Sequence, residues 1–235
     1  MQIAARVGTM EKNGGIELCA YIQSDGNAWI DSGYIPVEDQ RIEAVFALGP
    51  TYTRSCYFGI SIDSSISTPY CFWGSSPVDR RYFCRIRPDG TDWRYWNVTA
   101  NDGNSFFDGE FHVFSFPKNP VRRACNITVD DNTDISLTSQ YKSTVPKTLP
   151  TATLGVFCMK GEDGTIKYIT PTSMMKFKSL DFIDSHGVYL AKLRAAKKGD
   201  EFGIVDLVDN SWHGGVGGTI LGTVSANGGG ITANA

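Results

Sequence analysis

The chain has 235 residues and a formal net charge of −3, from 22 lysines and arginines against 25 aspartates and glutamates. The two signs are spread along the chain, so it has no overall field that would attract nucleic acid or an anionic membrane surface. A chain of this length can bury a substantial core without disulfides or metals, and single β domains of this size are common. Aromatic residues make up 12% of the sequence, which leaves some rings for a surface site once a core is filled.

The N-terminal sequence MQIAARVGTMEK has neither the basic start nor the long apolar run of a secretion signal. No stretch reaches the roughly 18 apolar residues that a membrane span requires. We therefore expect synthesis in the cytosol and no membrane insertion.

The six cysteines form no C-x-x-C pair, and each has apolar neighbours inside a predicted strand. They are Cys19, Cys56, Cys71, Cys84, Cys125 and Cys158. This context predicts free thiols packed as small hydrophobic side chains. One or two disulfides formed after release from the cell are the alternative.

Residues 1–17 are weakly patterned and are predicted to form an arm that leads into one domain, residues 18–224. Within it, segments with alternating apolar side chains are separated by turn signals at intervals of roughly 8–12 residues. The predicted strands are 41–48, 55–62, 69–75, 81–87, 93–99, 111–116, 124–129, 135–137, 154–160, 166–169, 174–184, 188–194 and 219–224.

A single helical turn is expected around residues 171–173, and no other helix. This pattern predicts an all-β fold, an antiparallel two-sheet β-sandwich. Closing the sandwich requires the first and last strands to lie near each other. Residues 225–235 are rich in glycine and are predicted to form a tail.

Two segments carry a resemblance to a known family. Near the end, FGIVDLVDNSWHG (residues 202–214) alternates as a strand, turns at Asp209-Asn210 and opens a return strand at Trp212. Near the start, YIQSDGNAWIDSGY occupies residues 21–34. The two segments resemble the closing hairpin and the opening motif of concanavalin A-like (laminin-G-like) β-sandwich modules of gut bacteria and their phages. The resemblance implies a jelly-roll sandwich that binds sugars, binds proteins or forms part of a particle surface.

Motifs for catalysis and metal binding are weak. Glucanases of the laminarinase type on this fold carry paired carboxylates as E-x-D-x-x-E, because one carboxylate protonates the leaving oxygen while the other attacks or activates water. The nearest candidates, Glu201, Asp206 and Asp209, have a different spacing. Asp206 lies where the resembled closing motif has an aspartate, so the resemblance implies that it caps backbone amides. The acids of residues 130–134 lack the glycine and glutamate of a calcium loop and are predicted to form a hairpin turn. We therefore predict no catalytic residues, no metal site and no cofactor.

Aromatic residues are the stronger indication of a binding site. Sugar-binding proteins stack an aromatic ring on the C–H face of a pyranose, while nearby amides read the hydroxyls. Residues 93–97, WRYWN, place alternate rings on both faces of a strand, and residues 72–73 pair Phe with Trp. Ordinary core packing of these rings is the alternative. The predicted carbohydrate-binding residues are Trp73, Trp93, Tyr95, Trp96 and Asn97.

These observations favour a non-catalytic carbohydrate-recognition or adhesion module. Its expected location is a phage virion, assembled after synthesis in the bacterial cytosol, where it contacts host-surface glycan; an extracellular or cell-surface location is the alternative. A purely structural virion decoration protein that binds other virion subunits is the second hypothesis, and a glycoside hydrolase is the third. The expected partners are a glycan or host-surface polysaccharide, other virion proteins and further copies of the chain, but not nucleic acid.

Overall fold

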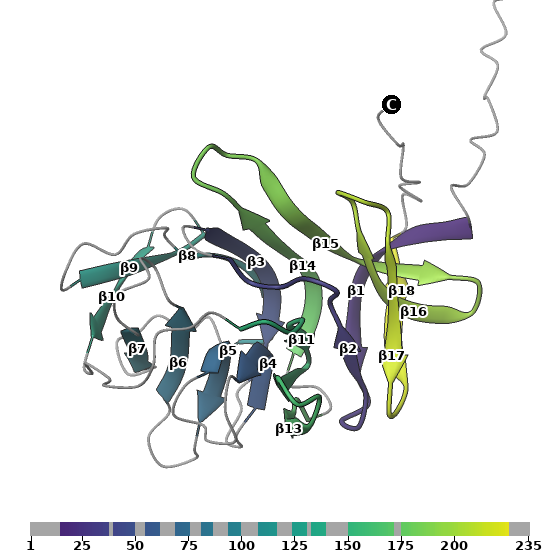
Figure 1. Cartoon of the computed structure of the whole chain (residues 1–235), viewed down its shortest axis with the longest axis horizontal. Helices are drawn as coiled ribbons and strands as arrows, with labels where there is room; N and C mark the ends of the chain where they lie inside the picture. The colour runs from purple at the N-terminus through teal and green to yellow at the C-terminus, as the bar shows by residue number, and fades with distance from the viewer. Residues whose placement is uncertain are drawn as a thin grey trace, which may run out of the picture.

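The structure, a computed structural model, describes eleven segments of the chain (Figure 1). They are residues 15–37, 40–49, 55–61, 69–75, 81–86, 94–99, 108–116, 124–130, 133–139, 150–171 and 175–225. Within residues 69–75, 81–86, 94–99, 124–128 and 133–139 only the backbone is described. The described residues form strands and turns, with no α-helix among them.

The described residues form eighteen strands. They are β1 (Ile16–Ser24), β2 (Trp29–Asp31), β3 (Arg41–Leu48), β4 (Ser55–Ser61), β5 (Pro69–Ser75), β6 (Arg81–Ile86), β7 (Arg94–Thr99), β8 (Phe111–Phe116), β9 (Ala124–Val129), β10 (Thr133–Ser139), β11 (Gly155–Val156), β12 (Cys158–Gly161), β13 (Ile166–Ile169), β14 (Met175–Ile183), β15 (Tyr189–Lys198), β16 (Glu201–Asp206), β17 (Trp212–Val216) and β18 (Ile220–Val224).

The hydrogen-bonded strand pairs follow a path that closes on itself. From β14 the path runs through β3, β8, β9, β10, β7, β6 and β5 to β4. It returns through β11, β2, β17, β16 and β15 to β14. The two layers of the sandwich are therefore joined by hydrogen bonds at both sides. Every pair is antiparallel except β12 with β4, which is parallel.

Strand β1 lies across the open end of the β14–β15 hairpin. Its first residues pair with the end of β15, Leu18 opposite Ala196, and its later Ile22 pairs with Phe177 of β14. Strands β14 and β15 diverge at this end of the hairpin. Strand β1 first runs along β15 and then along β14, so it is antiparallel to both. On its other side β1 pairs with β18, with a register shift between Cys19 and Tyr21. The expectation that the first and last strands are neighbours is confirmed.

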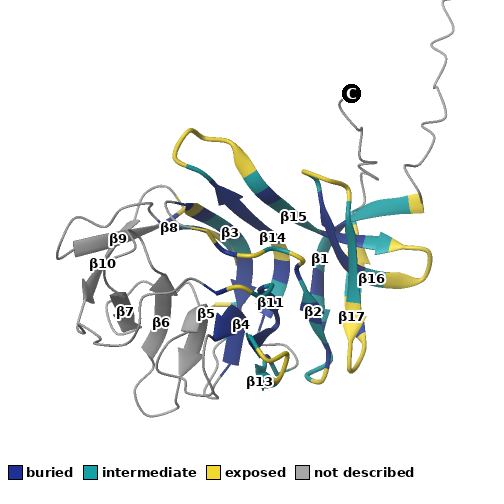
Figure 2. Ribbon diagram, in the orientation of Figure 1, coloured by how far each residue is buried: buried dark blue, intermediate teal, exposed yellow. Residues whose placement is uncertain are grey.

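The core lies between the two layers and is built from alternate residues of their strands (Figure 2). Strand β3 shows the pattern clearly, because Ile42, Ala44, Phe46 and Leu48 are fully buried while the residues between them are on average more exposed. Phenylalanines fill the centre, and Phe46 contacts the rings of Phe58, Phe114 and Phe177 at centroid distances near 6 Å, namely 6.0, 6.1 and 5.9 Å. Buried alternating faces on both layers confirm the predicted all-β sandwich.

One predicted strand is divided. The apolar run 154–160 reads as a single strand, but β11 ends at Val156 and β12 begins at Cys158. Phe157 between them has a φ of 64°, which reverses the chain direction and allows β11 to pair with β2 while β12 pairs with β13. The predicted hairpin at Asp209-Asn210 is confirmed, with Asn210 at a φ of 62°. The expected turn at 171–173 falls largely outside the described residues.

The domain boundaries remain a prediction. Strand β1 begins at Ile16, two residues before the expected start of the domain, and β18 ends at Val224. Most of the proposed arm and tail lies outside the described residues. In the part of the chain with described side chains, Cys19, Cys56 and Cys158 are buried free thiols.

Candidate functional site

Four of the five positions predicted to bind carbohydrate, Trp73, Tyr95, Trp96 and Asn97, lie on two strands, β5 and β7, that flank β6. The strand pairing sets Trp73 opposite Phe83, and Phe83 opposite Asn97, on one rung of the sheet. Trp96 pairs with Cys84 and Tyr95 with Arg85 on the adjacent rungs. Two strand spacings, about 9–10 Å, separate the backbones of β5 and β7.

This register brings the backbone of Trp73, Tyr95, Trp96 and Asn97 into one region, in which Trp96 alternates with the other three positions. Their side chains are outside the described part of the structure, and so is the whole of Trp93. The assignment of these five residues to a carbohydrate site therefore stays a prediction.

Described side chains form a second aromatic surface, which we call the ring patch: Tyr21, Phe111, Val113, Lys176 and Lys178. It lies on the outer face of adjacent strands β1, β14, β3 and β8. Phe111 and Val113 of β8 alternate with buried Phe114 and Phe116, and they are 37% and 39% exposed. Ala47 of β3 pairs with both Phe111 of β8 and Lys176 of β14, so only a small side chain lies between these two residues of the patch.

Two rings and two ammonium groups make up the centre of the ring patch. The rings of Tyr21 and Phe111 have centroids 6.0 Å apart and are tilted by 43°. The Nζ atom of Lys176 lies 5.2 Å from the Tyr21 ring centroid, and that of Lys178 lies 5.8 Å from the Phe111 centroid. Such cation–π contacts contribute only ~0.5–1 kcal/mol at exposed sites, so a ligand can displace the lysines from the rings. The patch thus offers apolar ring faces together with movable hydrogen-bond donors.

Sequence reasoning missed the ring patch because its residues are far apart in the chain. Strands β1, β8 and β14 each contribute only one or two outward residues to it. The available signal was alternation: Lys176 and Lys178 flank Phe177, and Tyr21 precedes Ile22, both of which are fully buried. Only the pairing of β1 with β14, of β14 with β3 and of β3 with β8 brings these positions together.

A charged cluster borders the ring patch at the start of β8. His112 Nδ1 lies 2.5 Å from Asp130 Oδ2, and its Nε2 lies 3.1 Å from Asp108 Oδ1. The other oxygen of Asp130 accepts the Val113 amide at 2.9 Å, and Asp130 has a φ of 53° in the β9–β10 turn. The predicted hairpin at residues 130–132 is therefore confirmed, and Asp130 holds it against β8.

The His112 cluster alters the ionisation of its members. Burial alone would lower the pKa of His112, but hydrogen bonds and the negative charges of Asp130 and Asp108 outweigh it and raise that pKa above 6.5. Burial likewise opposes ionisation of Asp130, yet the bonds to His112 and to the Val113 amide lower its pKa. These contacts therefore favour the charged forms of His112 and Asp130 more than water does for the isolated side chains.

Of the three carboxylates considered for catalysis, Asp206 and Asp209 are engaged with the backbone, whereas Glu201 is exposed. Asp206 is 7% exposed, and its Oδ1 accepts hydrogen bonds from the Lys192 and Val208 amides, each at 2.9 Å. Asp209 accepts the Ser211 amide at 2.8 Å within the β16–β17 turn. The expected capping role of Asp206 is confirmed, because its carboxylate ties the end of β16 to β15.

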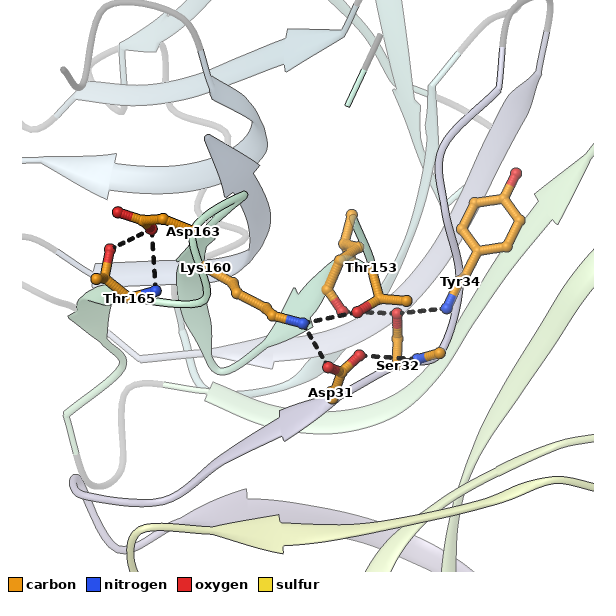
Figure 3. A network of polar contacts seen from close by, with 9 residues as sticks. Asp31, Ser32, Tyr34, Thr153, Lys160, Asp163 and Thr165 are labelled. Atoms are coloured by element: carbon orange, nitrogen blue, oxygen red, sulfur yellow. Dashed lines mark hydrogen bonds and ion pairs between the residues drawn. The ribbon is translucent and has the colours of Figure 1, made fainter. Parts of the chain in front are cut away.

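A third polar cluster connects the opening motif to the middle of the chain (Figure 3). Lys160 Nζ lies 2.5 Å from Asp31 Oδ2 and donates to Thr153 Oγ1 at 2.7 Å. Beside it, the Ser32 hydroxyl donates to the Leu154 carbonyl at 2.7 Å and accepts the Tyr34 amide at 3.1 Å. Burial opposes ionisation of Asp31, but the bonds to Lys160 and Thr153 lower its pKa. With each group bonded inside the protein, this cluster positions β2 against β11 and β12.

The described residues include no group of three or more histidines, cysteines and acids that could hold a metal ion. In the same part of the chain, no helix is long and apolar enough to cross a membrane.

No protein-family model matches the chain, and no curated protein matches it. Among solved structures, the chain is similar to domains LG4-5 of the mouse laminin alpha1 chain, with 15% sequence identity and a TM-score of 0.42. The match covers 73% of this chain and 42% of the laminin chain, so this chain spans less than half of that structure. Laminin-G modules are the type that the two terminal segments resemble. The fold class itself rests on the strand pairing and the core described above.

Proposed function

We propose that the chain is a non-catalytic recognition module that binds carbohydrate through the outer face of its sandwich. The ring patch carries this proposal, because it presents two neighbouring rings and two lysines on strands held rigid by the core. A pyranose can stack on an exposed ring while the ammonium groups donate to its hydroxyls or to an acidic substituent. Rings on paired strands need little reordering when a ligand binds, which lowers the entropic cost of binding.

The β5–β7 region is a second proposed location for the same activity. Its support is the backbone register, which sets Trp73 and Asn97 on one rung with Tyr95 and Trp96 beside them. A ligand that spans β5 to β7 would meet positions at which the sequence has aromatic residues or an amide.

The experiment is binding of the full chain to an array of bacterial surface polysaccharides and oligosaccharides, followed by substitution. Phe111→Ala should weaken binding at least tenfold. Tyr189→Ala is the matched control, because Tyr189 is 40% exposed and has Lys192 Nζ 4.4 Å from its ring centroid. It lies outside the ring patch, opposite Ile183 at the other end of β14 from Lys176 and Lys178. Its removal should leave binding unchanged.

Two further variants, Trp73→Ala and Trp96→Ala, distinguish the β5–β7 region from the ring patch as the binding site. Loss of binding in these variants but not in Phe111→Ala would keep the function and move the site to β5–β7. If no array glycan binds the wild-type chain, the carbohydrate proposal fails. A structural virion protein that binds other virion subunits then becomes the better account, and the open edge of β18 described below favours it.

We also propose that the module acts on a phage particle, with the extracellular or bacterial cell surface as the alternative. The support is the resemblance of the opening and closing segments to modules of gut bacteria and their phages. Detection of the chain by mass spectrometry in gradient-purified particles tests the location; recovery only in cell-surface fractions would overturn it.

A further inference from the structure

Strand β18 has an open edge along its whole length. Within the described residues it pairs with β1 on one side and with no strand on the other. The members of the closed path from β14 back to β14 each pair on both sides, although some do so over only two residues, as β10 does with β7. Strand β13 also pairs on one side only, but it has four residues and carries Lys167.

The backbone groups on the open side of β18 can be identified from its hydrogen bonds. The Thr219 carbonyl accepts the Asp25 amide at 3.1 Å, and the Ser225 amide donates to the Leu18 carbonyl at 3.5 Å. Residues of odd number therefore direct their peptide groups to β1. Because the direction alternates along a strand, Ile220, Gly222 and Val224 direct their N–H and C=O groups away from β1.

The composition of β18 lacks the features that protect sheet edges. Natural edges carry lysine, proline or a bulge that prevents another strand from pairing. Residues 219–225, TILGTVS, contain no charge and no proline. Leu221 is 43% exposed and Val224 is 37% exposed, so apolar side chains flank the open backbone groups.

We propose that β18 pairs with β18 of a second copy of the chain, antiparallel about a twofold axis at Gly222. In this register Gly222 faces its own counterpart, Ile220 faces Val224 of the second copy, and Leu221 faces its Thr223. Ile220, Gly222 and Val224 direct their peptide groups outward, so each can bond both its N–H and its C=O to the second copy.

Charge and shape both suit a second copy at this edge. No like charges meet across the axis, because every residue from 219 to 225 is uncharged. A side chain at position 222 would point inward, where a Cβ atom would overlap the Phe202 ring, so the edge has no side chain at its centre. A twofold contact uses the same five residues twice and needs no other complementary surface.

The test measures the mass of the full chain by light scattering and sedimentation over a wide range of concentrations. Wild type should form a dimer. The double variant Leu221→Lys with Thr223→Lys sets two lysines opposite two lysines and should be monomeric. The control, Leu221→Lys with Thr223→Glu, sets each lysine opposite a glutamate at the same positions and should remain dimeric. Melting curves check that both variants are folded, as expected for exposed positions.

Amide hydrogen exchange provides a second readout. The Gly222 amide should exchange more slowly as protein concentration rises in wild type and in the Lys/Glu variant, but not in the Lys/Lys variant. A monomeric wild type, or a dimer that the Lys/Lys variant does not weaken, overturns the proposal. If deletion of residues 226–235 converts a monomeric wild type into a dimer, the chain's own C-terminal segment is the occupant of the edge, and the proposal is also overturned.

Discussion

Gly203 of β16 and Gly214 of β17 lie directly opposite each other, yet only Gly214 has room for a side chain. A Cβ atom at position 203 would overlap the carbonyl oxygen of His213 and would lie 2.8 Å from the Trp212 ring. At position 214 the nearest atom would be Trp212 Nε1 at 3.6 Å, an ordinary contact. At this pair, the closing hairpin therefore requires glycine at position 203 and not at position 214.

Gly203→Ala should lower the free energy of unfolding by about 1–3 kcal/mol, because backbone and ring must move to admit the methyl group. Gly214→Ala should leave stability unchanged or raise it slightly, since alanine restricts the unfolded chain more than glycine does. Chemical denaturation followed by tryptophan fluorescence measures both. Equal effects in the two variants would contradict the asymmetry of this pair.

The His112 cluster predicts a pH dependence of stability. The pKa of His112 is raised in the folded protein, so its contribution is fully present below about 6.5, its value in the unfolded chain, and is lost as pH rises through the folded pKa. The pKa values of Asp108 and Asp130 are lowered, so their contribution is lost as pH falls through those values. Wild type should therefore exceed His112→Gln in melting temperature mainly between about pH 4 and 6.5.

Asp184→Asn provides the control for the pH profile. Asp184 also lies beside a histidine, but the His186 side chain is 83% exposed and their N···O distance is 3.7 Å. This variant should not reproduce the change that His112→Gln makes in the acid range above pH 5. A wild-type and a His112→Gln profile that stay parallel from pH 4 to 8 would show that the cluster contributes nothing.

The cysteines should be unreactive in the folded protein. Cys158 is fully buried, and burial raises its pKa well above the usual range; burial also raises the pKa of Cys19 to about 11. Thiolate is the reactive form, so neither should react with a thiol reagent at pH 8 while the protein is folded. Under denaturing, non-reducing conditions, six thiols should react. A count of two or four there would show that disulfides are present.

The sequence predicts local structure well where burial alternates within one strand. The ranges 41–48, 111–116 and 166–169 agree with the observed strands, and the β16–β17 turn lies at Asp209-Asn210 as expected. The break at Phe157 could not be predicted, because an uninterrupted apolar run gives no sign that one residue adopts a positive φ. The path of β1 across the β14–β15 hairpin was equally hidden, since it depends on where two strands diverge rather than on any local pattern.

The candidate functional residues divide in the same way, into those that could be predicted from the sequence and those that could not. The position of Asp206 in the closing hairpin, where the resembled family has an aspartate, identified it as a structural residue, and its bonds to the Lys192 and Val208 amides agree. The ring patch needed the long-range pairing of residues near 21, 111 and 177, which no spacing along the chain reveals. Residues 93–97, in contrast, could be selected from the sequence, because their rings lie close together in one segment.

The two aspartates of the closing hairpin separate a structural role from a catalytic one. Asp206→Ala removes an acceptor from two amides in a site that is 7% exposed and should lower stability by about 1–3 kcal/mol. Asp209→Ala removes one exposed acceptor and should cost about 0.5 kcal/mol or less. Asp206→Asn keeps an oxygen that can accept both amides, so most of the stability should return.

If the carboxylate were instead a catalytic group of a glycoside hydrolase, Asp206→Asn would abolish hydrolysis of a bound glycan while remaining folded. We expect no hydrolysis by wild type and unchanged glycan binding by Asp206→Asn, measured by product analysis and by the array.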